Sequence, residues 1–320
     1  SLLHEVHPET RIYNLDIVEP GTPLPTVKNY KPALGNGEEH AATFIYCDVR
    51  QPIELEKVNI TPDDVIFNFA AVHRTPGHPD PAYFETNIRG AENVCAFAER
   101  HGIRKIVFTS SIAPYGAAEE LKEETTLPMP NTPYGISKLV AEKIHQTWQA
   151  GGEGRQLTIV RPGVVFGRGE NGNFTRLYWG IRGHKFMYPG RKDTIKACIY
   201  VKELVRFMLY RLEHHDSGVE LYNCCYEPAY TIEHIVESMK RVTNMKVKVP
   251  FMPGWLIMTA AGIAGALGSP MGICPARVRK LQISTNICGK KLSASGYRFH
   301  YTFEEALADW YKDNGNLYLQ

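Results

Sequence analysis

The feature that most constrains the fold is a regular alternation of short apolar runs and helical patterns along the first half of the chain. Each apolar run is rich in β-branched or aromatic residues and has the length of a strand in a buried parallel sheet. Apolar residues at helical spacing lie between the later runs, over residues 82–101 and 133–149. Because strands that alternate with helices form βαβ units, we expect an α/β fold with a doubly wound parallel sheet. The predicted strands cover residues 11–15, 43–47, 65–69, 105–108 and 157–160.

The second half of the chain has a less regular pattern. A long Pro- and Gly-rich surface loop is expected over residues 20–40, and beyond about residue 171 the alternation fades. We therefore expect two domains, residues 1–170 and residues 171–320, with some segments of the second returning to the first. The later predicted elements are helices over residues 202–214, 232–243 and 303–311, and a strand over residues 219–222.

The composition excludes several classes of protein. Lys and Arg number 36 against 34 Asp and Glu, so the net charge is +2 and a nucleic-acid partner is not expected. The 12 histidines lack the spacing of a metal site, so no metal is expected. The 7 cysteines show no CxxC pattern and indicate free thiols in a reducing compartment, from which we expect a cytoplasmic protein.

One uncharged stretch raises the question of a membrane. It covers residues 249–276 and is strongly apolar over residues 255–267. A membrane span needs roughly 20 mostly apolar residues, and glycines and prolines interrupt this run. We expect a buried, Gly-rich helix pair in the second domain, and the alternative is an interfacial contact with a membrane.

The helix predicted over residues 133–149 carries the pair of residues that most strongly indicates chemistry. Thr132 suits its N-cap and Pro133 its first position. Tyr134 and Lys138 are four residues apart and share one face of the helix. A phenol with a reference pKa of about 10 is a poor base at neutral pH, and a neighbouring ammonium favours the phenolate. We expect Lys138 to lower the pKa of Tyr134; taken alone, the pair also fits two half-exposed helix residues.

Hydroxyl groups follow the strand predicted over residues 105–108. Ser110 and Ser111 lie at its carboxyl end, where open α/β sheets bind ligands, and Ser111 precedes Tyr134 by 23 residues. A hydroxyl at this position can hold a substrate oxygen while Tyr134 takes its proton. The alternative for both serines is ordinary capping of a turn or helix.

Eight sequence pieces, spread along nearly the whole chain, occur in the order typical of one enzyme family. They are NLD (14–16), CDVR (47–50), FNFAAV (67–72), ETNIRGAENV (85–94), KIVFTSSIAPYG (105–116), PYGISK (133–138), VRPGVVFGRG (160–169) and CIYVKELV (198–205). Together they resemble the extended short-chain dehydrogenase/reductases, in particular the NAD-dependent, nucleotide-sugar epimerase-like epimerase/dehydratase family. The resemblance implies a Rossmann-like fold in which residues 1–170 bind NAD and residues 171–320 mainly bind substrate. It also implies that Ser111, Tyr134 and Lys138 are the catalytic set.

The resemblance further implies the contacts with NAD. Asp16 matches the acid that binds the adenosine ribose hydroxyls, and a carboxylate there repels a 2′-phosphate and so favours NAD over NADP. The alternative for Asp16 is an ordinary turn residue. The other positions that match cofactor contacts are Asp48, Val49, Phe69, Ala70, Ala71, Tyr134, Lys138 and Pro162.

The residues after Ser111 reduce the number of reactions that the family resemblance allows. The dehydratase branch of the family carries an Asp-Glu pair there, whereas this chain has Ile112 and Ala113, which cannot transfer protons. We therefore expect an epimerase that acts on a UDP-sugar, in which Tyr134 removes a proton from the sugar hydroxyl at C4 and hydride passes to NAD and back. The alternatives are a sugar or 3β-hydroxysteroid-like dehydrogenase or reductase and, in third place, a non-catalytic NAD-binding protein.

The resemblance assigns further features of the substrate domain. Asn173 and Lys196 match substrate and phosphate contacts, and a Lys meets phosphate as a point charge. Many epimerases carry a late Arg-Pro-Gly-Asp run for the diphosphate, which this chain lacks. Arg277 or Arg279 is expected to serve instead; the alternative is that this stretch, with the apolar run before it, resembles the steroid-dehydrogenase-like branch. A homodimer through the helices at residues 82–101 and 133–149 is also expected.

The start of the chain differs from the family pattern. The resemblance implies an opening strand and a GxxGxxG turn whose amides hold the cofactor pyrophosphate, and no such turn precedes residues 11–15. Residues 1–6 fit the last turns of the helix that follows this turn. We therefore expect the natural protein to have roughly 20–30 further residues at its N-terminus.

Overall fold

The computed structural model describes residues 3, 5, 7–19, 42–73, 77–216, 218–256 and 282–320. The chain forms two compact units, each built from three segments. The first unit comprises Ser1–Gly116, Glu124–Pro162 and Leu204–Cys224, and the second comprises Ala117–Glu123, Gly163–Glu203 and Cys225–Gln320. The assignment of cofactor and substrate to residues 1–170 and 171–320 stays a prediction.

The first unit is built on parallel strands. Four of them form one sheet in the order β11-β6-β4-β3, and β1 and β2 form a separate parallel pair. Every strand predicted in this part of the chain is present. Their bounds are Ile12–Asp16 for β1, Ala42–Tyr46 for β2, Val65–Asn68 for β3, Lys105–Thr109 for β4, Gln156–Pro162 for β6 and Val219–Cys224 for β11.

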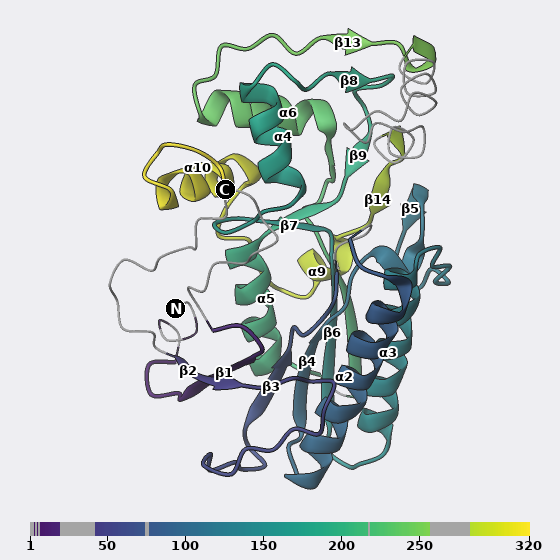
Figure 1. Ribbon diagram of the computed structural model, residues 1–320, viewed down its shortest axis with the longest axis vertical. Coiled ribbons are helices and arrows are strands. Elements are labelled where there is room, and N and C mark those ends of the chain that lie inside the picture. Colours follow the sequence, from purple (N-terminus) through teal and green to yellow (C-terminus); the bar gives the residue numbers. More distant parts are fainter. Residues whose placement is uncertain are drawn as a thin grey trace. The chain divides into compact units, whose positions relative to one another are not determined.

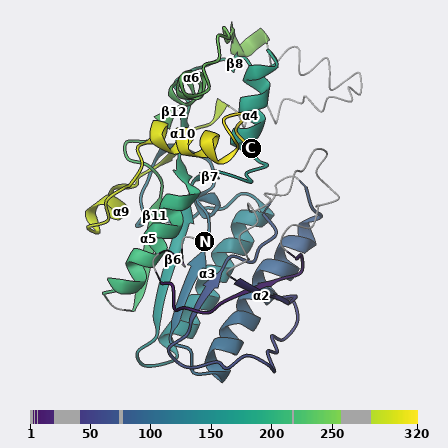
Figure 2. The same cartoon turned by 90° about the vertical axis from the view of Figure 1, so that its left-hand side faces the viewer.

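Helices cover both faces of the four-stranded sheet. Helices α2 (Asp80–Arg100) and α3 (Pro133–Ala150) pack against each other on one face, and α5 (Val201–Glu213) lies on the other (Figures 1 and 2). The Rossmann-like, doubly wound α/β fold is therefore confirmed. Its core consists of fully buried apolar residues, and each large one contributes about 1.5–3 kcal/mol by its burial. They include Ala98, Ile106, Phe108, Leu157 and Ile159.

The start of α3 follows from its local sequence. The Thr132 Oγ1 accepts a hydrogen bond from the Gly135 backbone N–H at 3.1 Å, and Pro133 occupies the first turn, where no N–H is needed. Both start signals are confirmed. The short 3₁₀ helix η1 (Ala113–Tyr115) packs against this first turn, which fixes where Tyr134 enters the helix.

The second unit combines short sheets and helices around an aromatic core. Strands β7 (Val164–Phe166) and β10 (Cys198–Tyr200) are parallel, and so are β8 (Tyr188–Pro189) and β13 (Phe251–Met252). A mixed sheet has the order β12-β9-β14-β5, formed by Tyr230–Thr231, Ile195–Lys196, Thr285–Ile287 and Ala118–Lys122. The helices are α4 (Asn173–Arg182), α6 (Ile232–Val242), α9 (Lys290–Ala294) and α10 (Phe303–Asp313).

Several predictions concern residues outside the described part of the chain. These are the loop over residues 20–40, most of residues 1–6, the helix pair expected within residues 249–276, and Arg277 and Arg279. Within the described ranges, no helix is both long and apolar enough to span a membrane. The described cysteines are free thiols, with Cys47 half-buried and the others buried.

Candidate active site

The hydroxyl-bearing turn lies where β4 ends in the first unit. The Ser110 backbone N–H donates to the Val160 carbonyl at 2.8 Å and so extends the β4–β6 pairing by one residue. The Ser111 Oγ accepts a hydrogen bond from the Ala113 backbone N–H at 3.1 Å, at the start of η1. Ser111 therefore stabilises its own turn, as the capping alternative expects, and also reaches Tyr134.

Tyr134 lies in the first turn of α3 and contacts both Ser111 and α2. Its ring centroid is 6.3 Å from that of Tyr83, a buried α2 residue. Burial raises the pKa of Tyr134, and the interaction with the Ser111 side chain partly opposes this rise. The two hydroxyls that the sequence places 23 residues apart are thus brought together.

Lys138 shares the helix face with Tyr134 but extends toward the sheet. Its side chain is only 1% exposed, and its Nζ lies 4.3 Å from the centroid of the Phe108 ring on β4. Burial lowers the pKa of Lys138 to about 7, and the charge of Glu142 opposes this change. The expectation that Lys138 lowers the pKa of Tyr134 is wrong for this structure, because burial dominates at the phenol and its pKa is raised.

A buried ion pair lies one turn beyond Lys138. Glu142 on α3 receives hydrogen bonds from Arg161 on β6, with Nε to Oε1 at 2.8 Å and Nη2 to Oε2 at 2.6 Å. The Ser110 Oγ donates to the same Oε1 at 2.5 Å. The side chains of Glu142 and Arg161 are 1% and 3% exposed, so this charged pair is almost completely removed from water.

A histidine on the same helix is held in its neutral form. The His145 Nδ1 donates to the Ala141 carbonyl at 2.7 Å, and its Nε2 accepts from the Asn68 Nδ2 at 3.2 Å. The ring stacks on Phe108 at a centroid distance of 4.1 Å. Burial lowers the pKa of His145 to about 4, so the ring acts as a fixed hydrogen-bonding link to β3 at neutral pH.

An asparagine on α2 ties the segment after β3 to α3. The Asn87 Oδ1 accepts from the Val72 backbone N–H at 2.8 Å, and its Nδ2 donates to the Val72 carbonyl at 3.1 Å and to the Ser137 Oγ at 2.8 Å. Asn87 is 3% exposed. This one side chain therefore orients the strand end that carries Phe69, Ala70 and Ala71.

Sequence reasoning assigned no role to Asn87, Glu142, His145 or Arg161. One signal was available for Glu142, which follows Lys138 by four residues and so lies on the same helix face. Another is that polar residues at the apolar positions of a helix, such as Asn87 and His145, need buried partners.

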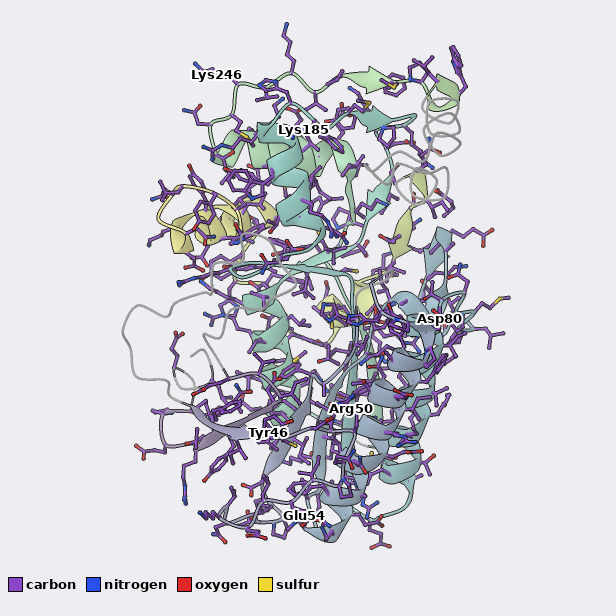
Figure 3. All side chains as sticks on the ribbon, viewed as in Figure 1. Tyr46, Arg50, Glu54, Asp80, Lys185 and Lys246 are labelled. Atoms are coloured by element: carbon purple, nitrogen blue, oxygen red, sulfur yellow. The ribbon has the colours of Figure 1, made fainter. Side chains whose placement is uncertain are left out.

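The residues predicted to hold adenosine lie at one edge of the β1–β2 pair. Asp16 is the last residue of β1, is exposed, and accepts a hydrogen bond from the Val18 backbone N–H at 3.1 Å. Asp48 follows β2, and the Arg50 side chain donates to it with Nη2 to Oδ2 at 2.6 Å (Arg50 is labelled in Figure 3). These hydrogen bonds from Arg50 lower the pKa of Asp48. Because the strands are parallel, both carboxylates lie at their carboxyl ends.

The remaining predicted cofactor positions also lie at strand ends. Phe69 is 56% exposed just after β3, and the Ala70 N–H donates to the Asn68 Oδ1 at 3.2 Å. The Val49 carbonyl accepts from the Asn93 Nδ2 at 2.7 Å, and the Pro162 carbonyl at the end of β6 accepts from the Ile112 N–H at 3.2 Å. The exposed Asp16 carboxylate and the small strand-end residues Ala70 and Ala71 fit a dinucleotide that bears ribose hydroxyls, whereas the Asp48 carboxylate is half-buried and already held by Arg50.

The predicted substrate residues lie in the second unit. Asn173 is the first residue of α4 and is exposed, and its Oδ1 accepts from the Arg176 Nη2 at 2.8 Å. Lys196 lies on β9, and its Nζ donates to the Ile283 carbonyl at 2.7 Å. Their roles toward substrate stay predictions. Across the ranges that the structure describes, no three His, Cys, Asp or Glu side chains are grouped to hold a metal ion.

Comparisons with known proteins identify the family of this chain. A family model described as the NAD dependent epimerase/dehydratase family matches residues 19–225. A relative from Escherichia coli O157:H7, N-acetyl-alpha-D-glucosaminyl-diphospho-ditrans,octacis-undecaprenol 4-epimerase, is 32% identical over 266 residues, which cover 81% of this chain and 80% of that protein.

Solved structures share the fold at lower identity. UDP-N-acetylglucosamine 4-epimerase from Methanobrevibacter ruminantium M1 is 19% identical with a TM-score of 0.73, over 98% of this chain and 94% of that one. UDP-glucuronic acid 4-epimerase from Bacillus cereus is 17% identical with a TM-score of 0.71, over 99% of this chain and 95% of that one.

Proposed function

The chain belongs to the NAD dependent epimerase/dehydratase family, and from this premise we propose that it is an NAD-dependent 4-epimerase of a sugar joined to a diphosphate. The observation that carries the proposal is the contact between Ser111 and Tyr134 at the carboxyl end of β4, with Lys138 one helical turn away. A proton acceptor beside a second hydroxyl suits reversible oxidation of a sugar hydroxyl.

The proposed roles of the residues follow from this geometry. The Ser111 hydroxyl hydrogen-bonds the sugar oxygen, and Tyr134 takes the proton of the C4 hydroxyl and later returns it. Lys138 is proposed to contact the ribose next to the nicotinamide, since in this structure its ammonium faces Phe108 and does not lower the pKa of Tyr134. NAD, when bound, supplies the hydride acceptor and donor. The residues proposed to hold it are Asp16, Asp48, Val49, Phe69, Ala70, Ala71, Tyr134, Lys138 and Pro162.

The turn after Ser111 supports epimerisation over dehydration. Ile112 and Ala113 have no side-chain group that transfers a proton, and their backbone N–H groups are used by the Pro162 carbonyl and the Ser111 Oγ. A second acid at this turn would be needed to expel water from the sugar. We therefore propose that the keto-sugar is reduced again rather than dehydrated.

Two carriers are considered for the group attached to the other side of the diphosphate, a lipid and a nucleotide. The Escherichia coli relative is named for a sugar on a diphospho-undecaprenol, whereas the structural neighbours are named for UDP-sugars. The uncharged run over residues 249–276 is compatible with an apolar carrier. Both kinds of substrate contain a sugar linked to a diphosphate, and Asn173 and Lys196 are the proposed contacts for this shared part.

The test supplies both carriers. The protein is incubated with NAD and UDP-N-acetylglucosamine, UDP-glucose, UDP-galactose or undecaprenyl-diphospho-N-acetylglucosamine in detergent, and the products are identified by NMR. We expect the C4 epimer without net NADH. Stoichiometric NADH from a hydroxyl substrate would instead indicate a dehydrogenase, and absence of turnover by a protein with bound NAD would refute the proposal.

One substitution tests the assigned base. Tyr134→Phe removes the phenolic hydroxyl and keeps the ring that packs against Tyr83, so the fold is retained. We expect kcat to fall roughly 10²–10⁴-fold, the usual contribution of general acid–base catalysis. Unchanged turnover by Tyr134→Phe, with an unaltered circular dichroism spectrum, would show that another group moves the proton.

Two further proposals concern the state of the protein. We propose a homodimer through α2 and α3. The support is that two apolar residues of α3, Ile136 and Val140, are 40% and 36% exposed. Light scattering after size exclusion tests it, and a monomer at micromolar concentration would contradict it. The free thiols of the described cysteines support the proposal of a cytoplasmic location.

A further inference from the structure

The buried pair of Glu142 and Arg161 lies directly beside the lysine of the proposed catalytic set. Glu142 follows Lys138 by four residues on α3, and its carboxylate is the charge that favours the ammonium form of Lys138. The Lys138 ammonium itself faces an aromatic ring and receives no hydrogen-bonding partner from the described residues. The protonation state of Lys138 therefore depends on nearby charges that lie beyond hydrogen-bonding distance, such as that of Glu142.

The carboxylate of Glu142 is held in place by two strands. Arg161 on β6 binds both of its oxygens, and Ser110, just after β4, donates to Oε1. Three hydrogen bonds, two from β6 and one from the residue that follows β4, leave a buried glutamate very little freedom to change rotamer. Ser110 also precedes Ser111 directly, so the same anchor ties α3 to the turn that carries the proposed substrate-binding hydroxyl.

The other groups around Lys138 contribute little opposing charge. Tyr134 is neutral because its pKa is raised, and His145 is neutral because its pKa is lowered to about 4. Phe108 on β4 is apolar, and Asn87 from α2 is uncharged. The titratable or charged groups that face this region are Tyr134, Glu142 and His145 on α3, Tyr83 on α2 and Arg161 on β6.

We propose that Glu142 is a positioning residue for Lys138: held by Arg161 and Ser110, its carboxylate keeps the buried Lys138 ammonium charged, one helical turn from Tyr134. This inference rests on the proposed function, since it assigns Glu142 a role through Lys138 rather than on the substrate. The alternative is a purely structural ion pair, in which Glu142 does no more than neutralise Arg161.

The direct test is an NMR titration of Lys138 in the full chain. Lysine labelled with ¹³C at Cε reports the charge of each ammonium, and Lys138→Met identifies the signal of Lys138. In Glu142→Gln the carboxylate is lost and the Arg161 charge is no longer neutralised. We expect the midpoint of the Lys138 titration to move to lower pH by about 1 unit or more. The alkaline limb of the kcat profile is expected to move in the same direction.

A second ion pair in the same unit provides a matched control. Arg211 donates to Glu220 from Nε at 3.0 Å and from Nη2 at 2.6 Å, and the two side chains are 3% and 8% exposed. Glu220→Gln therefore leaves an equally buried arginine with only the exposed Asp216 carboxylate, at 3.4 Å from its Nη2. We expect Glu220→Gln to lower the melting temperature and to leave the Lys138 titration unchanged.

A double variant keeps the test decisive if Glu142→Gln does not fold. Glu142→Gln/Arg161→Met removes both charges, so the Lys138 midpoint should fall below that of the wild type; where Glu142→Gln folds as well, its midpoint should be the lowest of the three. If the midpoint in every variant that folds equals that of the wild type, the inference is wrong and the pair is structural. If the NAD-bound protein forms no C4 epimer from any of the sugar diphosphates, the proposed function fails, whereas the NMR titration still decides whether Glu142 controls the charge of Lys138.

Discussion

Single side chains in the proposed site balance burial against charge. Lys138 is 1% exposed and faces an aromatic ring, which brings its pKa down to about 7. A lysine with this pKa is charged in about half of the molecules at neutral pH, whereas an ordinary lysine with a pKa of about 10.4 is almost always charged. Small changes around Lys138 therefore have large effects on the fraction of molecules in which this lysine is charged.

Asn87 provides a prediction at the scale of one residue. Asn87→Ala removes the hydrogen bonds to both backbone groups of Val72, and buried groups without partners cost about 1–3 kcal/mol. We expect the free energy of unfolding to fall by this amount and NAD to bind more weakly, because Val72 follows directly on the proposed cofactor segment. Urea denaturation and calorimetric titration with NAD measure the two effects.

The control for Asn87 is an asparagine in the other unit. The Asn314 Nδ2 donates to the carbonyls of Trp310 and Gln320, so Asn314→Ala also loses two backbone contacts. Asn314→Ala is expected to reduce stability with no change in NAD affinity. Equal NAD affinity in Asn87→Ala and the wild type would show that Val72 does not position the cofactor segment.

The sequence correctly predicted which residues share a face of α3, but it did not predict the direction in which the Lys138 side chain extends. Four-residue spacing correctly places Tyr134 and Lys138 on one face, since helical periodicity fixes this. It does not determine where the long lysine side chain extends, and here Lys138 points to Phe108 rather than neutralising the phenol. The direction depends on how α3 packs on β4, which no local pattern encodes.

At the scale of elements, the site depends on how closely α3 approaches η1. A Cβ added at Gly135 would lie 2.6 Å from the Ala113 carbonyl oxygen and 3.1 Å from the Pro130 Cβ. The first distance is shorter than any van der Waals contact, so the helix start and the Ser111 turn would have to separate. The absence of a side chain at Gly135 is therefore what allows Ser111 to reach Tyr134.

Gly135→Ala is predicted to be damaging although alanine favours helices. Overpacking costs about 1–3 kcal/mol, which exceeds the roughly 1 kcal/mol that alanine gains over glycine in a helix. We expect lower stability and a loss of kcat, measured by thermal unfolding and by the epimerase assay. Gly180→Ala in α4 is the control, since its Cβ would meet only ordinary contacts at 3.4 Å or more and should be neutral or stabilising. Full activity of Gly135→Ala would contradict this account of the Ser111–Tyr134 contact.

At the scale of the whole chain, the sequence predicted the helices and strands better than it predicted which side chains pair with each other. Apolar runs and helical spacing located the strands and helices of the first unit because burial imposes their periods on the sequence. The ion pair of Glu142 and Arg161 was missed because it joins a helix to a strand 19 residues later, and Ser110, which follows β4, joins it from 32 residues earlier. Which strands are neighbours follows from the order β11-β6-β4-β3, and this order is a property of the folded sheet.

Two buried bases make the stability of the folded chain depend on pH. Lys138 has a folded pKa of about 7 against a model value of 10.5, and His145 a folded pKa of about 4 against 6.5. Both pKa values are lowered by folding, so the unfolded chain takes up protons first as the pH falls. Stability is therefore lost from pH 10.5 to about 7 through Lys138, and again from pH 6.5 to about 4 through His145.

Lys138→Met separates the first of these effects from the second. A shift of the size seen at Lys138 corresponds to roughly 4–5 kcal/mol at full protonation, and methionine fills a similar volume without a charge. At pH 7 we expect the free energy of unfolding of Lys138→Met, measured by urea denaturation, to exceed that of the wild type by about 2–4 kcal/mol. This difference should disappear near pH 10. The loss of stability below pH 6.5 should remain in Lys138→Met, because His145 is unchanged, and should weaken in His145→Gln. If Lys138→Met and the wild type were equally stable at pH 6 and at pH 10, Lys138 would not be buried as a strained charge, and the sensitivity of the site to Glu142 would lose its physical basis.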